Sequence, residues 1–168
     1  MLVVSTTRLR LAEQALVARF PVTTRSLDAL LLRHMKAFAT AKRIDWQVVL
    51  RADAVPAPER TANRDWANLL RVVAAALPGV KAELAATEGH VLLTEPGLLA
   101  RDDQMPFLGD LMSSTGRPGG PTRLWVLVPS DGQALRLTLD GQPLPVFGTD
   151  QWERIPERWL LGQREDAA

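Results

Sequence analysis

The stretch Gly89-His90-Val91-Leu92-Leu93-Thr94-Glu95-Pro96-Gly97 decides the fold class of this chain. It is an apolar run that ends in a carboxylate and a Pro-Gly break. Successive apolar residues without alternation are typical of strands that are covered on both faces, as in parallel sheets. We therefore predict a buried strand over 91–93 that runs into a loop and then a helix.

A second apolar run, Leu124-Trp125-Val126-Leu127-Val128, is closed by Pro129 and predicts another buried strand. Between the two runs lies a helical pattern carrying Phe107, Leu108, Leu111 and Met112, with Asp102 or Asp103 as its expected N-cap. Two such strands joined by a helix form a βαβ unit with a right-handed crossover. The two strands are therefore expected to be parallel and adjacent or nearly adjacent.

The first half of the chain adds further strands and helices. Leu2-Val3-Val4 predicts a strand, and one of Ser5, Thr6 and Thr7 is expected to cap the helix that follows. Residues 21–24 predict a short strand before a helix capped by Ser26. A 3.6-residue period over 66–77 predicts another helix, capped by Asn63 or Thr61 and ended or kinked at Pro78-Gly79. The run over 44–52 is too short to assign by period.

The last part of the chain has a different pattern. Residues 135–139 alternate, Asp140-Gly141 suits a two-residue turn, and residues 143–146 return as a strand that its prolines confine to an edge. Trp152 and Trp159 suggest a short closing helix or turn packed on the sheet. The predicted fold is α/β: a three-layer, mostly parallel sheet with flanking helices, a layout like that of nucleotide-binding folds, and a small C-terminal hairpin.

Composition limits both the organisation and the location of the chain. Its 168 residues, 46% hydrophobic and 23% charged, suit a single α/β domain over 1–168. Because a strand at residue 2 is unusual in a complete protein, we expect the domain to be excised from a longer chain. The net charge of +1 predicts no general attraction to polyanions. The lack of cysteine, of a long apolar segment and of a secretory signal favours a cytoplasmic protein without membrane contact.

The strand and helix order makes a phosphate site the first chemistry to test, and the motifs for it are missing. The first strand leads into Ser5-Thr6-Thr7-Arg8, and the glycine-rich loop over 116–120 has no lysine and precedes a strand, so there is no P-loop. A dinucleotide fingerprint, a nucleophile elbow and a zinc-hydrolase motif are also missing from the sequence. We therefore predict no catalytic residue and no cofactor.

Several charged residues still fall near the ends of the predicted strands. The arginines among them are Arg8, Arg10, Arg101, Arg117 and Arg123. Speculative phosphate contacts are Thr6, Arg8, Arg101 and Arg123, with solvated side chains as the plainer interpretation. Glu95 and Asp102, with Asp103, are speculative acidic groups for a divalent ion, although strand-end and helix-capping roles are commoner. With only two histidines, His34 and His90, we expect no histidine metal site, and His34 fits the edge of a packed helix.

Four segments carry a family resemblance: 95–101, 116–120, 124–129 and 139–146. In these segments the chain resembles the C-terminal region of the PglW family, the large serine/threonine kinases of actinobacterial phage-growth-limitation systems, also called type II BREX. The resemblance implies an accessory domain of a bacterial antiviral defence protein whose parent is a serine/threonine kinase. Kinase activity is not carried over, because the chain has no glycine-rich ATP loop, H-R-D loop or D-F-G motif.

Two functions follow as hypotheses. The first is a non-catalytic domain for assembly or regulation, with protein partners in a defence complex. The second is a phosphate-directed domain that binds nucleotide or DNA, with metal-dependent nuclease action as a variant. The second requires Arg8, Arg101 and Arg123 to converge on one crevice. The oligomeric state and the identity of the partners do not follow from the sequence.

Overall fold

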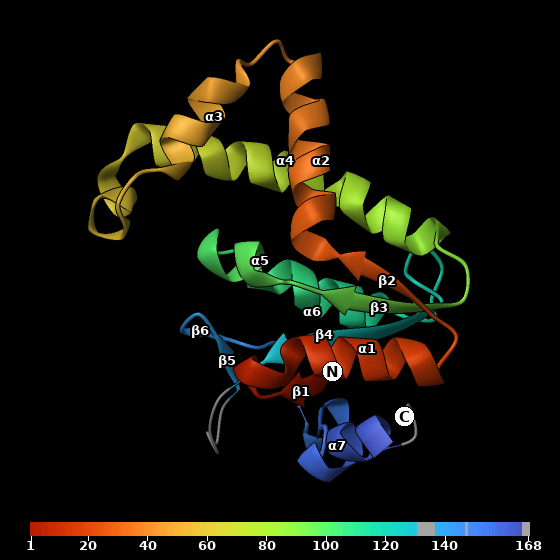
Figure 1. The fold of residues 1–168 in the computed structure, drawn as a ribbon. Helices are drawn as coiled ribbons and strands as arrows, with labels where there is room; N and C mark the ends of the chain where they lie inside the picture. The colour runs from red at the N-terminus through yellow and green to blue at the C-terminus, as the bar shows by residue number, and fades with distance from the viewer. Residues whose placement is uncertain (131–136, 147, 166–168) are drawn as a thin grey trace.

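The computed structural model describes residues 1–130, 137–146 and 148–165. It shows a mixed α/β fold, as predicted (Figure 1). The strands are β1 (Leu2–Val4), β2 (Val22–Ser26), β3 (His90–Thr94), β4 (Arg123–Pro129), β5 (Thr138–Leu139), β6 (Gln142–Pro143) and β7 (Glu153–Arg154). The α-helices are α1 (Leu9–Arg19), α2 (Leu27–Ala41), α3 (Trp46–Asp53), α4 (Arg64–Ala86), α5 (Gly97–Arg101), α6 (Met105–Ser114) and α7 (Glu157–Glu165). Short 3-10 helices are η1 (Thr6–Arg8), η2 (Ala57–Ala62) and η3 (Thr149–Gln151).

Within the described residues, five parallel strands form the main sheet in the order β2-β3-β4-β1-β7. Val91 pairs with Leu124 and Leu93 with Val126, so the two apolar runs are adjacent parallel strands. This prediction is confirmed. The apolar character of both runs is explained by the two layers of helices that cover the sheet.

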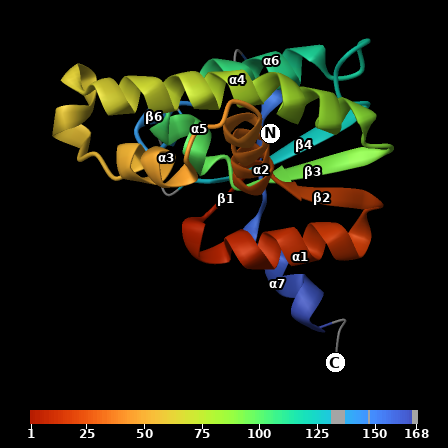
Figure 2. The same ribbon diagram turned by 90° about the horizontal axis from the view of Figure 1, so that it is seen from above.

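The side chains of the central strands divide between two apolar clusters, one on each face of the sheet. Val91, Leu93 and Val126 belong to the larger cluster, while Leu92 and Leu127 belong to the smaller one, as the two-residue period of a strand requires. The larger cluster contains residues of α2 to α6, and the smaller contains residues of α1 and α7. Figure 2 shows α1 and α7 on one side of the sheet and α4 and α6 on the other. The three-layer prediction is confirmed.

Two of the helix caps predicted for the first half of the chain are present and one is not. Ser26 Oγ accepts the N–H of Ala29 at 3.1 Å, and Asn63 Oδ1 accepts the N–H groups of Asp65 and Trp66. The expected cap at Ser5, Thr6 or Thr7 is wrong, because η1 intervenes and Arg8 occupies the N-cap of α1 without a side-chain hydrogen bond. The unassigned run over 44–52 is mostly the helix α3, which Asp45 caps through the N–H of Gln47.

The helix α4 does not end at Pro78-Gly79; it continues to Ala86. Inside a helix, proline removes one backbone donor and its ring crowds the carbonyl of the preceding turn, which often kinks or breaks the helix. Val80 and Leu84, both fully buried, continue the apolar stripe beyond it. Packing on this stripe therefore outweighs the local cost of the proline and the glycine.

The hairpin is present but shorter than predicted. Leu139 pairs with Gln142, and Asp140 and Gly141 have φ angles of +48° and +82°, so the predicted two-residue turn has the positive φ angles of type I′. Part of the first arm, 135–136, lies outside the described residues. The second arm is regular only over Gln142–Pro143, although Leu144 still donates its N–H to the carbonyl of Leu137 at 2.9 Å.

The tail contributes a strand that the sequence did not predict. The short segment β7 pairs in parallel with β1, through Leu2 opposite Glu153 and Val3 opposite Arg154. The predicted closing helix is α7, and its Trp159 packs on the α1 side of the sheet. Trp152 packs on the other face, with the core that includes the hairpin leucines.

Candidate functional site

Ligands of open α/β sheets usually bind outside the carboxyl ends of the strands, so this edge is the candidate site. Here the ends of β2 and β3 are followed by Asp28, in the first turn of α2, and by Glu95. The N–H of Asp28 donates to the carbonyl of Glu95 at 3.1 Å, and Asp28 Oδ1 accepts the N–H of Leu98 at 2.9 Å. Glu95 has a φ of +52°, which turns the chain sharply out of β3. A carboxylate of the chain itself thus occupies the beginning of α5.

The electrostatics of this edge do not favour an anion. Burial raises the pKa of Asp28 to about 6, the hydrogen bond from Leu98 opposes that rise, and the nearby carboxylates of Glu95 and Asp140 add to it. Asp140 comes from the hairpin turn, and its carboxylate lies close to Gly97 beside that of Asp28. Three acidic side chains from separate elements therefore influence one another at this edge.

The arginines that the sequence placed near strand ends do not converge. Arg8 follows β1 and binds Glu157 of α7 at 3.1 Å. Arg101, at the end of α5, binds the carboxylate and the carbonyl of Asp53, each at 2.7 Å. Arg123 is the first residue of β4, so it lies at the amino edge of the sheet, where its Nη1 is 3.1 Å from Nε2 of His90.

The other polar residues of the prediction are similarly dispersed. Thr6 is exposed in η1, and Arg10 is exposed in α1. Arg117 is exposed in the loop between α6 and β4. Because Arg123 is at the opposite edge from Arg8 and Arg101, the single crevice that the phosphate hypothesis requires is not formed by these three arginines.

The expected capping of α6 by Asp102 or Asp103 is wrong. The helix begins at Met105, and Gln104 occupies its N-cap without a side-chain hydrogen bond. The two aspartates instead close α5: Asp103 has a φ of +56°, and the N–H of Gln104 donates to the carbonyl of Leu99 at 2.8 Å. This is the hydrogen-bond pattern of a Schellman motif, in which the left-handed residue is usually glycine. Because an aspartate occupies this position, the sequence contains no glycine that would indicate the end of α5.

The same turn at the end of α5 leaves Asp102 buried. Only 3% of the residue is exposed, and its Oδ1 is a buried atom without a hydrogen-bond partner in the described part of the chain. Burial raises the pKa of Asp102 to about 6. Arg101 opposes this rise, and Asp53 adds to it. Sequence reasoning had no signal for this burial, because it follows from the left-handed turn at Asp103.

The hypothesis of a divalent ion needs Glu95, Asp102 and Asp103 together. Among residues 1–130, 137–146 and 148–165, no three His, Asp or Glu side chains gather as metal ligands. Asp103 Oδ1 instead accepts a hydrogen bond from the side chain of Gln142 at 3.1 Å. The structure therefore does not bring the three carboxylates into a common metal site.

A large cleft of about 690 Å³ opens between η2, α4, α5 and the hairpin. Its charged lining side chains are Arg60, Arg101, Asp103 and Asp140. The guanidinium of Arg60 lies 4.1 Å from the ring centroid of Trp66 and donates through Nε to the carbonyl of Val55. This cleft mixes both signs of charge, and its arginines already have partners.

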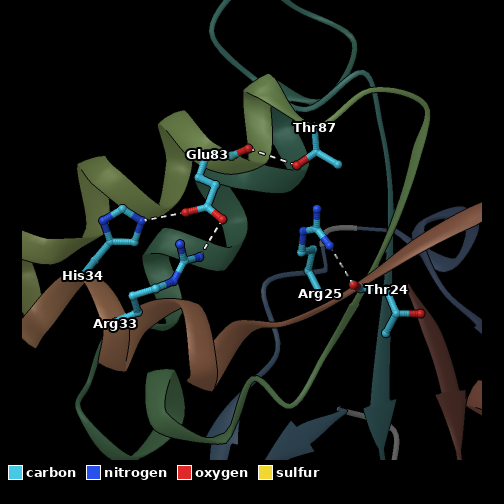
Figure 3. Close-up of polar contacts among 6 residues, drawn as sticks. All are labelled: Thr24, Arg25, Arg33, His34, Glu83 and Thr87. Carbon is cyan, nitrogen blue, oxygen red and sulfur yellow. Dashed lines mark hydrogen bonds and ion pairs between the residues drawn. The ribbon is translucent and has the colours of Figure 1, made fainter.

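Another polar group, which sequence reasoning missed, joins α2 to α4 (Figure 3). Glu83 accepts hydrogen bonds from Arg33 at 2.6 Å and from His34 at 3.0 Å. These partners, Arg33 first, lower the pKa of Glu83 below its usual value. His34 therefore lies at the edge of a packed helix, as expected. In the sequence, this contact is indicated by the glycine at position 79 inside a helical pattern. A Cβ at that position would lie 2.5 Å from Nδ1 of His34.

The same view shows two polar contacts closer to the sheet (Figure 3). Thr87 Oγ1 donates to the carbonyl of Glu83 at 3.0 Å, and Arg25 Nη1 donates to the carbonyl of Thr24 at 3.3 Å. Both contacts secure the backbone around the helix end and the edge strand. This group therefore has the features of a structural contact between α2 and α4.

No helix of the described residues has the length and apolar character that crossing a membrane requires. Comparison with known proteins gave no matching family model and no matching solved structure. Among curated proteins, the chain is 33% identical over 120 residues to the probable kinase PglW of Streptomyces coelicolor. The alignment covers 68% of this chain but only 8% of PglW. The resemblance that the sequence suggested is confirmed: this chain is similar to one limited region of the kinase PglW.

Proposed function

We propose that this chain is a non-catalytic α/β domain of a PglW-type phage-defence protein and serves its assembly or regulation. The similarity to a region of PglW supports the connection with that protein. The sequence contains no glycine-rich ATP loop, H-R-D loop or D-F-G motif, so the kinase chemistry of such a protein belongs to another part of it.

The observation that carries the non-catalytic assignment is the bond from the N–H of Leu98 to the carboxylate of Asp28 at 2.9 Å. In nucleotide-binding α/β folds, free N–H groups at a helix beginning after a strand bind phosphate. Here an internal anion holds that position after β3, and Glu95 and Asp140 add negative charge around it. A phosphate would have to displace Asp28 and approach two further carboxylates.

The proposal is tested in PglW of Streptomyces coelicolor, by deleting the region that aligns with this chain or replacing it with this chain. For a domain of assembly or regulation, the deletion should abolish protection against phage while the purified kinase still phosphorylates itself. The replacement should restore protection at least in part. Full protection without the region would contradict the proposal.

A second candidate is a phosphate-directed function, which the cleft between η2, α4 and α5 favours because Arg60 and Arg101 line it. A thermal-shift panel of nucleotides, with and without magnesium, and of short duplex DNA tests this directly. The first proposal expects no shift from any of them. A shift that Arg60→Gln abolishes, with Arg51→Gln as an exposed control outside the cleft, would move the preference to the second candidate.

A further inference from the structure

A smaller cavity of about 250 Å³ lies among α2, α3, α4 and α5, and nothing in the proposed function uses it. Its walls are mostly apolar side chains, including Met35, Trp46 and Leu98. The charged side chains that line it are Asp53 and Asp102, both carboxylates. The cavity therefore combines an apolar interior with charge of one sign.

Asp102 gives this cavity its chemistry. The residue is only 3% exposed, and its Oδ1 has no hydrogen-bond partner in the described part of the chain. Buried polar atoms in native proteins nearly always have a partner, and Asp102 is one of the residues that line this cavity, so its unpartnered carboxylate oxygen points to a donor from outside the chain.

The neighbouring Arg101 does not serve as this donor. Arg101 Nη2 lies 2.7 Å from Oδ1 of Asp53 and also donates to the carbonyl of Asp53 at 2.7 Å. Its guanidinium group is thereby turned to Asp53. Among the described residues, Asp102 therefore keeps an acceptor without a partner, whereas the carboxylate of Asp53 is already paired with Arg101.

We propose that this cavity binds an organic cation, an alkyl-guanidinium or alkyl-ammonium group whose N–H donors bond to Asp102. These two groups carry donors and no acceptor, which matches a cavity whose charged groups are only acceptors. Their hydrogen bonds to a carboxylate are charge-assisted, and their alkyl stems suit the apolar walls. At about 30 Å³ for each water-sized group, the volume fits roughly eight non-hydrogen atoms, the size of a short alkyl-guanidinium.

Such a cation has two sources: a free amine or guanidine, or the side chain of a lysine or arginine on a protein partner. The same cavity is lined by Leu32 and Leu50, whose exposed fractions are 40% and 44%. Exposed leucines beside the cavity offer apolar contact to residues that flank an inserted side chain. The cation chemistry is the same in both cases, and the experiment distinguishes the sources.

The experiment is calorimetric titration of the whole chain with butylguanidinium chloride, and with butylurea as its uncharged counterpart. We expect butylguanidinium to bind and butylurea to bind at least about tenfold more weakly, because only the former donates charge-assisted hydrogen bonds. Asp102→Asn should reduce the affinity for butylguanidinium by at least about tenfold. The neighbouring Asp103→Asn, which lies outside this cavity, should leave the affinity unchanged.

A second pair of ligands identifies the source: a capped Leu-Arg-Leu peptide and the same peptide with citrulline in place of arginine. Tighter binding of the arginine peptide than of butylguanidinium assigns the cavity to a partner side chain, and the reverse order assigns it to a free cation. If Asp102→Asn fails to fold, Leu50→Trp is used in its place. This change narrows the cavity at an exposed position, so it should weaken the binding of both butylguanidinium and the arginine peptide. Equal binding of charged and uncharged ligands, no binding of either cation, or full affinity in Asp102→Asn would overturn the proposal.

Discussion

At the scale of single residues, Gly79 decides how closely α2 and α4 approach. A Cβ at this position would lie 2.5 Å from Nδ1 and 2.9 Å from Cε1 of the His34 ring. The ring has little freedom to move away, because its Nε2 is bonded to Glu83, which also holds Arg33. The glycine is therefore retained inside a helix despite its low helix propensity.

Gly79→Ala should accordingly destabilise the protein by about 1 to 3 kcal/mol, the usual cost of overpacking, although alanine is the better helix former. The measurement is the urea midpoint at constant slope. Gly162→Ala is the matched control, because the structure places nothing within 4 Å of an added Cβ there. It should be neutral or stabilising by up to about 1 kcal/mol.

The double variant His34→Ala with Gly79→Ala separates the clash from other effects. Removing the ring should relieve the clash, so the double variant should be more stable than the sum of the single changes predicts. Strictly additive effects would show that Gly79 is not kept small by His34.

Asp28 and Asp102 make stability depend on pH. Burial raises the pKa of each from 3.8 to about 6, so both carboxylates are easier to ionise in the unfolded chain. Their favourable contribution is complete below 3.8 and is lost as pH rises through about 6. Glu83 acts in the opposite direction and only at lower pH, because its pKa is lowered from 4.5.

Raising the pH from about 5 to about 7 should therefore reduce the free energy of unfolding. Asp102→Asn should remove part of this loss, since its side chain no longer ionises. Urea midpoints of both proteins at the two pH values provide the measurement, with Asp103→Asn as a control that keeps the original slope. A variant profile as steep as that of the original protein would contradict the assignment to Asp102.

At the scale of elements, two of the four predicted helix caps, those of α2 and α4, are correct. Ser26 and Asn63 indicate where their helices begin, because their side chains accept hydrogen bonds from backbone N–H groups two or three residues ahead. The end of α5 cannot be predicted from the sequence, because Asp103 occupies the left-handed position where glycine is usual. For α4 the sequence left open an end or a kink at Pro78-Gly79, and the helix continues because burial of Val80 and Leu84 outweighs the cost of Pro78.

Asn63→Ala should cost about 0.5 to 2 kcal/mol, because two N–H groups at the start of α4 lose their acceptor. Thermal unfolding followed by circular dichroism measures this loss. Asn68→Ala, at an exposed position within the same helix, should change stability by at most about 0.5 kcal/mol. Equal effects of the two changes would mean that the cap contributes nothing.

At the scale of the whole molecule, the tail is part of the sheet and packs against both apolar clusters. Met1 donates its N-terminal amine to the carbonyl of Gln151 at 2.7 Å, and the N–H of Ile155 donates to the carbonyl of Val3 at 2.9 Å. Leu160 is 1% exposed, in the cluster that includes Ala12 and Leu16 of α1. The two ends of the chain therefore stabilise each other.

Ending the chain at Gly148 should lower the free energy of unfolding by several kcal/mol, a large share of the roughly 5 to 15 kcal/mol typical of a domain. Urea denaturation measures the change. A finer test compares Leu160→Ala, expected to cost about 2 to 5 kcal/mol, with the exposed Leu161→Ala, expected to cost less than about 0.5 kcal/mol. An unchanged midpoint after truncation would make the tail an appendage.

The sequence allowed the fold to be predicted much better than the site. Long apolar runs such as 91–93 and 124–128 report two covered faces, which is enough to predict the parallel sheet and its layers. The two charged residues of β7 have no such pattern, because their pairing depends on β1. For the arginines the chain order was already informative: Arg123 precedes its strand, whereas Arg8 and Arg101 follow theirs, so in a parallel sheet Arg123 lies at the opposite edge.

The position of β1 between β4 and β7 has a consequence for synthesis on the ribosome. Leu2 pairs with Leu127 on one side and with Glu153 on the other. At about 5 to 20 residues per second, Leu127 follows Leu2 by roughly 6 to 25 s. During that interval the apolar strand β1 has neither of the strands that pair with it, β4 and β7. A nascent chain halted before β4 should therefore be a substrate for chaperones, and one released after β7 should not.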